Sequence, residues 1–313
     1  MVMRSALLAF GILLVLVQQF VQSISLQAQF VLFILGVAAV GIPHGAADLL
    51  VASKNASGKK VFSKRSFHLN YMGKLVFFAL LFWLFPVAAN LIFVICAAFH
   101  FGETDLARFT KINLAKEIFV IFYGLLIVAV IILPHFDSLK PMFILFKSGH
   151  ENEVFIATID QNRFAILCGI TMITFISFLL YVSTNPDPAG QYVKFLASYV
   201  TLLFVLYKLP MILGFTFYFV LWHSIFSLKN IFYYLRKDGL IPIKSIVKQI
   251  SFYSLISFCG FLVFSLTGLI FLNNHSFIAY VFLALAVLTA PHMLVMHNMY
   301  KSAKFLPIIE KYC

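Results

Sequence analysis

Two short phrases, each within an otherwise apolar run, contain a histidine followed closely by the pattern Gly-x-x-Asp-Leu. They are "GIPHGAADLL" over residues 41–50 and "AFHFGETDLA" over residues 97–106. Ionisable side chains inside membrane spans are costly, and they usually face a bundle interior or a polar cavity, where they pair with another group. Imidazole is the commonest side-chain metal ligand and coordinates in its neutral form. His44 and His100 are therefore the first candidates for chemistry.

Two further histidines fall in apolar runs: His223 in "YFVLWHS" (218–224) and His292 in "APHML" (290–294). On a ten-segment topology with both termini cytoplasmic, all four histidines lie on segments that run from outside to inside. Each of them lies in the cytoplasmic half of the membrane. A single histidine in such a run is more often a hydrogen-bonded structural residue. Four at a similar depth predict a shared metal site, and nitrogen ligands suit Fe, Cu, Zn and Ni.

Three acids near these histidines are candidates for a supporting role. A ligating imidazole needs a carboxylate, carbonyl or water for its other ring nitrogen. Asp48 lies one helical turn after His44, and Glu103 and Asp105 closely follow His100. The alternative is that these acids cap the cytoplasmic helix ends or serve helix packing. The sequence shows no Ser-His-Asp or paired-carboxylate motif, so no catalytic residue is assigned apart from the metal ligands.

The composition indicates which elements position these residues. Of the 313 residues, 62% are hydrophobic and only 11% are charged, and the mean hydropathy is +1.00. Soluble domains are closer to half apolar and a quarter charged, so the sequence predicts an integral membrane protein. The net charge of +12 is then read as a cytoplasmic excess of basic residues, and no nucleic-acid partner is expected. The four cysteines form no C-x-x-C pair, which argues against a thiolate zinc site.

The hydropathy pattern predicts an all-α polytopic bundle of about ten membrane segments, forming one integral-membrane domain over residues 1–313. The third and fourth segments are short for a bilayer, which needs about 20 residues per helix. They are therefore either two spans or one kinked span broken at Pro86. The predicted segments are 5–22, 28–51, 71–86, 88–101, 116–134, 163–182, 191–208, 210–228, 249–272 and 277–298.

The charge distribution favours ten segments. With both termini inside, the cytoplasmic stretches hold 19 of the 23 Lys and Arg residues. If the third and fourth segments were one span, the basic loop 229–248 would fall outside, against the positive-inside tendency. We therefore predict ten segments, both termini cytoplasmic, and a multi-pass protein of the cell membrane. The apolar run after Arg4 is predicted to be a retained helix and not a signal peptide, because it lacks a clear small-x-small cleavage site.

Taken together, the motifs resemble the Brp/Blh family of bacterial and archaeal membrane beta-carotene 15,15'-dioxygenases (bacteriorhodopsin-related protein-like). The matching phrases follow the family's order and are spread over most of the chain: "PHGAAD" (43–48), "FHFGETD" (99–105), "YFVLWHS" (218–224) and "APHML" (290–294). The resemblance implies a membrane enzyme that cleaves β-carotene at its central double bond with O2, giving two molecules of retinal. It also implies a non-haem Fe(II) cofactor, a carotenoid entering from the lipid phase, and a functional link to a microbial rhodopsin.

Carried over by position, His44, His100 and His223 match the family's iron ligands. In the family, another histidine usually follows one turn after the Trp-His-Ser histidine, preceded by Arg. Here "WHSIFSLKN" has Phe226 and Ser227 at those places. A neutral hydroxyl is a poor Fe(II) ligand, so the fourth position is filled by His292, by water, or not at all.

Three competing functions are considered. A catalytically altered relative would bind carotenoid or retinal without cleaving it, and Ser227 motivates this alternative. An unrelated membrane transporter would use intramembrane His and Asp as a proton relay, although these residues cluster at one depth instead of forming a path. A di-iron desaturase or hydroxylase would need dense His-x-x-x-His boxes, which the chain lacks.

Overall fold

The computed structural model describes residues 2–56, 62–107, 109, 113–145, 150–185, 189–237, 241–271 and 277–302. These residues form helices, and no strand occurs among them. Ten of the helices are long and apolar enough to cross a membrane. The all-α, ten-segment prediction is therefore confirmed.

The first half of the chain supplies the segments that carry His44 and His100. Its elements are α1 (Val2–Leu16), η1 (Val17–Val21), α2 (Leu26–Gly36), η2 (Val37–Gly41), α3 (Ile42–Gly45), α4 (Asp48–Ala56), α5 (Lys64–Leu84), α6 (Pro86–Asp105), α7 (Leu114–Ile132) and η3 (Leu133–His135).

The second half supplies the segments that carry His223 and His292. Its elements are α8 (Phe136–Leu145), α9 (His150–Thr184), α10 (Ala189–Lys208), α11 (Met211–Thr216), η4 (Phe217–Ser224), α12 (Ile225–Arg236), α13 (Ile243–Phe271) and α14 (Phe277–Ser302).

The third and fourth segments are separate helices, as the charge distribution predicted. Pro86 occupies the first turn of α6, where its missing N–H costs nothing and its fixed φ suits a helix start. Helix α5 begins at Lys64, seven residues before the predicted boundary, because its polar first turns precede the apolar run. Ser63 caps this earlier start by accepting a hydrogen bond from the Ser66 backbone N–H.

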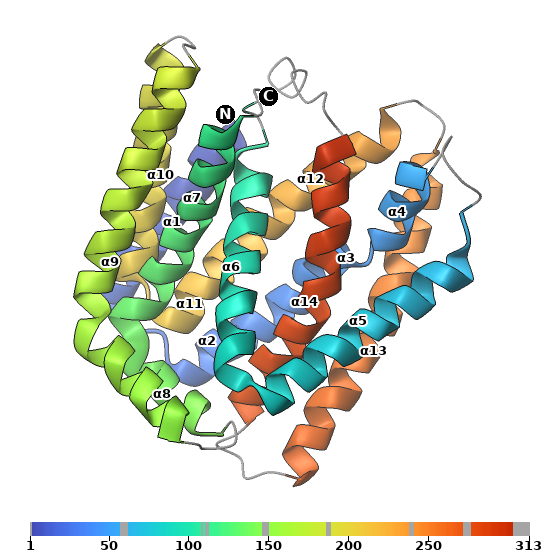
Figure 1. The fold of residues 1–313 in the computed structure, drawn as a ribbon, viewed down its shortest axis with the longest axis horizontal. Coiled ribbons are helices and arrows are strands. Elements are labelled where there is room, and N and C mark those ends of the chain that lie inside the picture. The colour runs from blue at the N-terminus through green and yellow to red at the C-terminus, as the bar shows by residue number, and fades with distance from the viewer. Residues whose placement is uncertain are drawn as a thin grey trace.

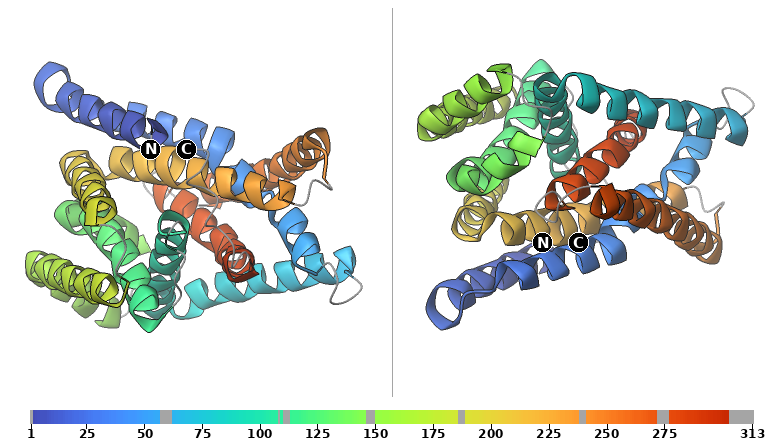
Figure 2. Two further views of the ribbon diagram at one scale, coloured as in Figure 1. Left: turned by 90° about the horizontal axis from the view of Figure 1, so that it is seen from above. Right: turned by 90° about the horizontal axis from the view of Figure 1, so that it is seen from below.

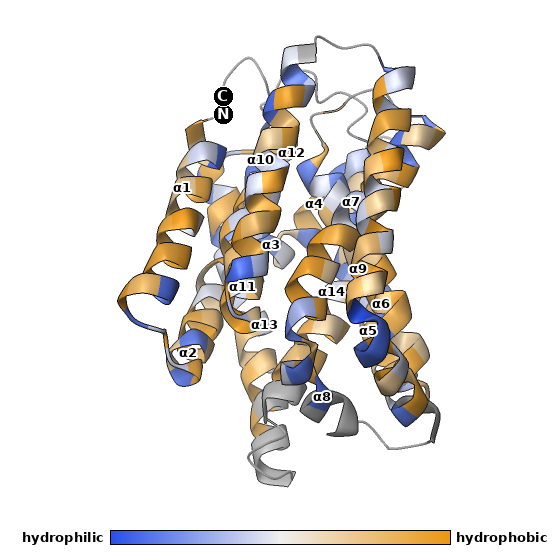
Figure 3. Cartoon of the chain, turned by 90° about the vertical axis from the view of Figure 1, so that its left-hand side faces the viewer, coloured by the Kyte–Doolittle hydropathy of each residue, from blue (hydrophilic) through white to orange (hydrophobic). Residues whose placement is uncertain are grey.

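The helices stand side by side, and α14 runs through the middle of the bundle, in contact with α4, α5, α6 and α13 (Figures 1 and 2). We call the end at which α1 begins and α4, α6, α12 and α14 finish the upper end, as it is drawn in Figure 1. Hydrophobic colour covers most of the length of the helices (Figure 3). Outward-facing apolar side chains such as Leu80, Ile95, Phe175 and Leu255 are exposed, as expected for surfaces that contact lipid.

Helices α6 and α7 approach so closely that glycine is required at two points of contact. A Cβ atom at Gly102 would lie 2.0 Å from the Val120 carbonyl oxygen, and one at Gly124 would lie 1.8 Å from the Ala98 carbonyl oxygen. Small residues allow this kind of backbone approach in membrane bundles. The contact fixes α6, and therefore His100, against α7.

Candidate metal centre

The structure brings the four intramembrane histidines together. Ligating nitrogens of His44, His100 and His223 all lie within 4.8 Å of one another. His292 joins this group, with its ring centroid 4.7 Å from that of His44 and 5.2 Å from that of His100. All four side chains are buried. We call these four residues the histidine cluster.

Irregular helix geometry positions His44. Pro43 has no backbone N–H, and a proline ring clashes with the carbonyl four residues earlier in a regular helix. The preceding turn is a π-helix, η2, in which the Ile42 N–H donates to the Val37 carbonyl five residues back. The His44 Nδ1–H donates to the Gly41 carbonyl. That bond leaves Nε2 of His44 facing the cluster without a protein partner.

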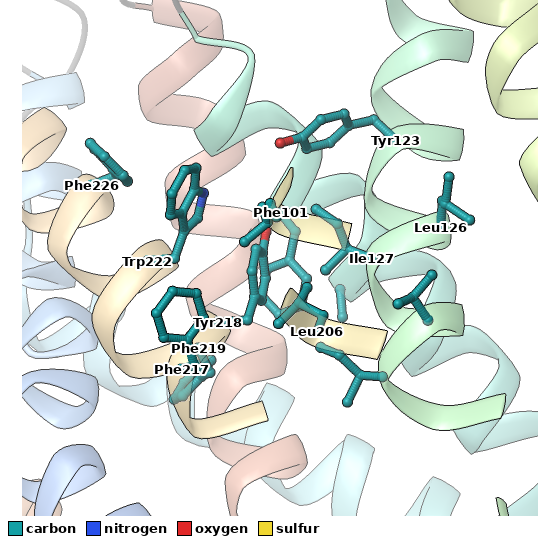
Figure 4. Packing of buried hydrophobic residues seen from close by; sticks show 14 of the residues in the cluster. Phe101, Tyr123, Leu126, Ile127, Leu206, Phe217, Tyr218, Phe219, Trp222 and Phe226 are labelled. Carbon is teal, nitrogen blue, oxygen red and sulfur yellow. The ribbon is translucent and has the colours of Figure 1, made fainter. Parts of the chain in front are cut away.

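His223 also lies on a π-helical segment, η4. Wider turns of this kind are frequent at functional sites. The Ser224 hydroxyl donates to the Phe219 carbonyl at 2.7 Å, which satisfies an acceptor within the widened turn. The rings of Phe101 and Phe219 lie 4.7 Å and 6.1 Å from the His223 ring. Three aromatic side chains of this segment, Tyr218, Phe219 and Trp222, lie near Phe101 of α6 (Figure 4).

His292 is held by Asp48, which the sequence had placed beside His44. The His292 Nδ1–H donates to Asp48 Oδ1 at 2.7 Å. The other carboxylate oxygen, Oδ2, accepts a hydrogen bond from the Tyr71 hydroxyl at 3.0 Å. We call Tyr71, Asp48 and His292 the polar chain. Tyr71 was missed in the sequence, because it is a lone tyrosine on a different helix with no motif around it.

The ring nitrogens that remain free fit a metal ion. His44 Nε2, His292 Nε2 and both ring nitrogens of His100 and His223 are buried and have no hydrogen-bond partner in the structure. Buried polar atoms are rarely left unsatisfied. Four neutral imidazoles that converge with free nitrogens are the donor set that Fe, Zn, Cu or Ni prefers. A divalent ion bound among them would satisfy these nitrogens.

The other two predicted supporting acids contact different groups. Glu103 Oε1 accepts from His297 Nδ1–H at 2.8 Å. Asp105 accepts from the Tyr123 and Tyr218 hydroxyls at 3.0 and 3.2 Å. The Trp222 indole N–H also donates to it, at 3.0 Å. Among the hydrogen bonds of the described residues, Asp48 is therefore the acid that contacts the histidine cluster directly. Asp105 instead holds η4 through the residue that precedes His223.

The remaining histidines lie outside the cluster. His68 is exposed on α5, before the predicted start of the third segment at residue 71, and His135 is half-buried with its Nε2 unpartnered. His297 contacts Glu103 and the ring of Phe99. His275 and the side chain of His150 lie outside the described part of the chain.

An apolar cavity of about 320 Å³ lies below the histidine cluster, toward the lower end. Phe101 and Phe219 line it at its upper limit, and both rings contact His223. Farther down it is lined by residues including Phe82, Leu139 and Ala286. Such a space suits a hydrocarbon, because it offers few polar groups for hydrogen bonding. We call it the lower cavity.

A second hollow, of about 580 Å³, lies at the upper end between α4, α5 and α14. Tyr71, the outer member of the polar chain, lines it, and so does Pro291, which precedes His292. Its other lining residues are mixed: polar ones include Asn55, Ser66, Asn70, Lys74 and Asn298, and apolar ones include Phe62, Phe67 and Val295. We call it the upper pocket.

Ser227 lies on α12, one turn after His223. It is fully buried, and its hydroxyl has no hydrogen-bond partner in the structure. The position where the resembled family usually has a histidine is therefore inside the protein, on the helix that continues from η4.

Comparison with known proteins identifies a family. A family model described as "Beta-carotene 15,15'-dioxygenase" matches residues 35–300. This range contains all four histidines of the cluster, Asp48, Tyr71, the lining of the lower cavity and all of the upper pocket's lining except Ser302. No curated protein matches, and no solved structure matches.

Proposed function

Because the chain belongs to the beta-carotene 15,15'-dioxygenase family, we propose that it cleaves β-carotene at the central double bond with O2 and releases two molecules of retinal. The observation that carries this proposal is the junction of the histidine cluster with the lower cavity at Phe101 and Phe219. A metal-binding set thus adjoins a space suited to an apolar polyene. The reaction balances, because one C=C bond breaks and each oxygen atom of O2 ends in one aldehyde.

We propose Fe(II) as the cofactor, held by His44, His100, His223 and His292. When bound, Fe(II) would supply the activation of O2, which does not react readily with a polyene unaided. Three protein ligands with an open position are typical of catalytic metal sites, so three of these four histidines would suffice to hold the ion. His292 lies outside the tightest group of ligating nitrogens.

The protein's own groups fix which ring nitrogen faces the metal. The Gly41 carbonyl accepts the Nδ1 proton of His44, and Asp48 accepts the Nδ1 proton of His292. Each bond leaves Nε2 of that ring as the lone-pair donor, and partners of this kind also raise ligand basicity. The lower cavity would hold the polyene so that one bond lies at the cluster, and its apolar walls would exclude water.

The membrane orientation is also a proposal. Most of the described Lys and Arg residues lie toward the upper end, for example Arg4, Lys64, Lys244 and Lys301, whereas Lys140, Arg163 and Lys208 lie at the lower end. This distribution supports a cytoplasmic upper end, with both termini inside and the protein in the cell membrane. Retinal is apolar and would leave through lipid, where a microbial rhodopsin is one expected recipient.

Ser227 supports a second candidate function, in which a catalytically altered relative binds carotenoid or retinal without cleaving it. The two candidates make different predictions in bacteria that accumulate β-carotene. Expression of the cleaving enzyme would bleach the cells and yield retinal by chromatography, and the purified protein would contain iron. A His223→Ala variant serves as the matched control.

Iron in the purified protein without any retinal would favour the altered relative. Absence of iron from the protein, even after incubation with Fe(II), would contradict the metal centre. A Ser227→His variant sharpens the distinction, because a large gain in retinal formation would show that the departure from the family pattern had weakened the site.

A further inference from the structure

We infer that the upper pocket is the entrance through which a hydrated divalent cation reaches the histidine cluster, with Asp48 as the first anionic ligand it meets. This inference rests on the proposed metal centre, and it concerns a site and a step that the cleavage reaction does not include.

The lower cavity is a poor route for a cation. Its lining is almost entirely aliphatic and aromatic, with residues such as Phe93, Leu125 and Phe282. Moving an ion from water into such surroundings without ligands is strongly unfavourable. The cluster itself is buried, so a cation needs a polar path from another direction.

The upper pocket offers such a path. Asn55, Ser66, Asn70 and Asn298 line it with amide and hydroxyl groups, which can replace water molecules around an ion one at a time. Asn70 and Asn298 are exposed, so the pocket communicates with solvent at the upper end.

The polar chain connects this pocket to the cluster. Tyr71 lines the pocket, and its hydroxyl bonds to Asp48 Oδ2 at 3.0 Å. Asp48 Oδ1 bonds to His292 at 2.7 Å. One side chain thus separates the pocket from a buried carboxylate, and that carboxylate directly contacts a cluster histidine. Carboxylates attract divalent cations more strongly than neutral groups do, so Asp48 would draw the ion past Tyr71.

Lys74 provides an internal check on this route. Its side chain lines the same pocket, and its positive charge would slow the approach of a cation. Charges at an entrance change association rates by about tenfold or more. Lys74→Met, which keeps the length and removes the charge, should therefore speed loading at low ionic strength, and the gain should shrink as salt is added.

The test measures the loading rate of the full chain in nanodiscs after removal of metal by a chelator. Co(II) is the probe, because its visible absorption reports coordination without any turnover. Asn298→Trp places a large side chain at an exposed position of the pocket. We expect it to slow Co(II) loading and release several-fold while the equilibrium affinity stays unchanged. Ala286→Leu, which fills part of the lower cavity, is the matched control and should load at the wild-type rate.

Two results would overturn the route: wild-type loading in Asn298→Trp, or slowed loading in Ala286→Leu. A wild-type protein that binds no Co(II) at equilibrium would instead contradict the proposed metal centre, and with it the destination of the route. Equal affinities with unequal rates are the outcome that supports the entrance.

Discussion

The lower cavity and the upper pocket lie on opposite sides of the same four histidines and differ in chemistry. Aromatic and aliphatic residues such as Phe101 and Phe219 form the lower wall. Asparagine, serine and lysine side chains, with Tyr71, supply the polar part of the upper wall, which also contains Phe62 and Phe67. An enzyme that has a buried metal centre and acts on a hydrocarbon must admit both a hydrated cation and an apolar substrate. These two ligands need opposite surroundings. The two hollows show how one bundle can offer each ligand its own approach.

The histidine cluster forms the boundary between these regions, so its loss should have the largest effect. His100→Ala removes a ring whose two nitrogens are both unpartnered. We expect iron binding and retinal formation to be abolished together, measured by metal analysis and chromatography.

His68→Ala is the control for this prediction, because His68 is exposed on α5 and lies outside the cluster. It should retain wild-type iron content. Full iron occupancy in His100→Ala would show that the metal binds elsewhere. The histidine cluster would then not be a metal centre between the two hollows.

Asp48→Asn should weaken metal binding, but less than His100→Ala does. The amide keeps the size of the carboxylate but loses the charge beside His292. Partners of metal-ligating histidines typically contribute about 10–100-fold in affinity, and we expect a weakening of metal binding in that range. Titration of the metal-free protein with Co(II) measures it.

The control for Asp48→Asn is Asp137→Asn, which changes an exposed acid in an ion-pair group with Lys140 and Arg163. Its metal affinity should equal that of the wild type. If Asp48→Asn also left the affinity unchanged, the polar chain would have only a structural role.

The sequence predicted the features that depend on the length of the apolar runs and on the depth of residues in the membrane. Apolar runs of membrane length gave ten helices, and the positive-inside tendency separated α5 from α6 at Pro86. The same topology placed His44, His100, His223 and His292 at one depth, and the structure brings them together. Their role as iron ligands stays a prediction.

The sequence could not give the contacts that depend on how the helices are rotated. Asp48 is one turn from His44, yet its carboxylate faces α14 and bonds to His292. The helix is interrupted between them, because α3 ends at Gly45 and α4 begins at Asp48, so the spacing of the two residues in the sequence does not show which neighbour a side chain will face. Tyr71 and the π-helical turns at η2 and η4 were missed for the same reason, since each depends on tertiary packing.

A change in the lower cavity should affect the substrate and spare the metal. Ala286→Leu adds volume where the polyene would lie. We expect retinal formation to fall several-fold, with iron content and Co(II) affinity unchanged. Assays in detergent micelles with β-carotene measure the first quantity. A loss of metal in this variant would show that the lower cavity and the cluster are not independent regions.

Ser227→Ala, which changes the residue one turn after His223, should have the smallest effect. The buried Ser227 hydroxyl has no partner in the structure, and a buried polar group without a hydrogen bond costs about 1–3 kcal/mol. Removing it should leave the protein equally or more resistant to thermal unfolding, with no change in metal affinity. Ser224→Ala is the matched control, because that hydroxyl donates to the Phe219 carbonyl at 2.7 Å and its loss should destabilise η4. If Ser227→Ala weakened metal binding instead, the hydroxyl would itself be a ligand, and the serine would replace the family's histidine in function as well as in position.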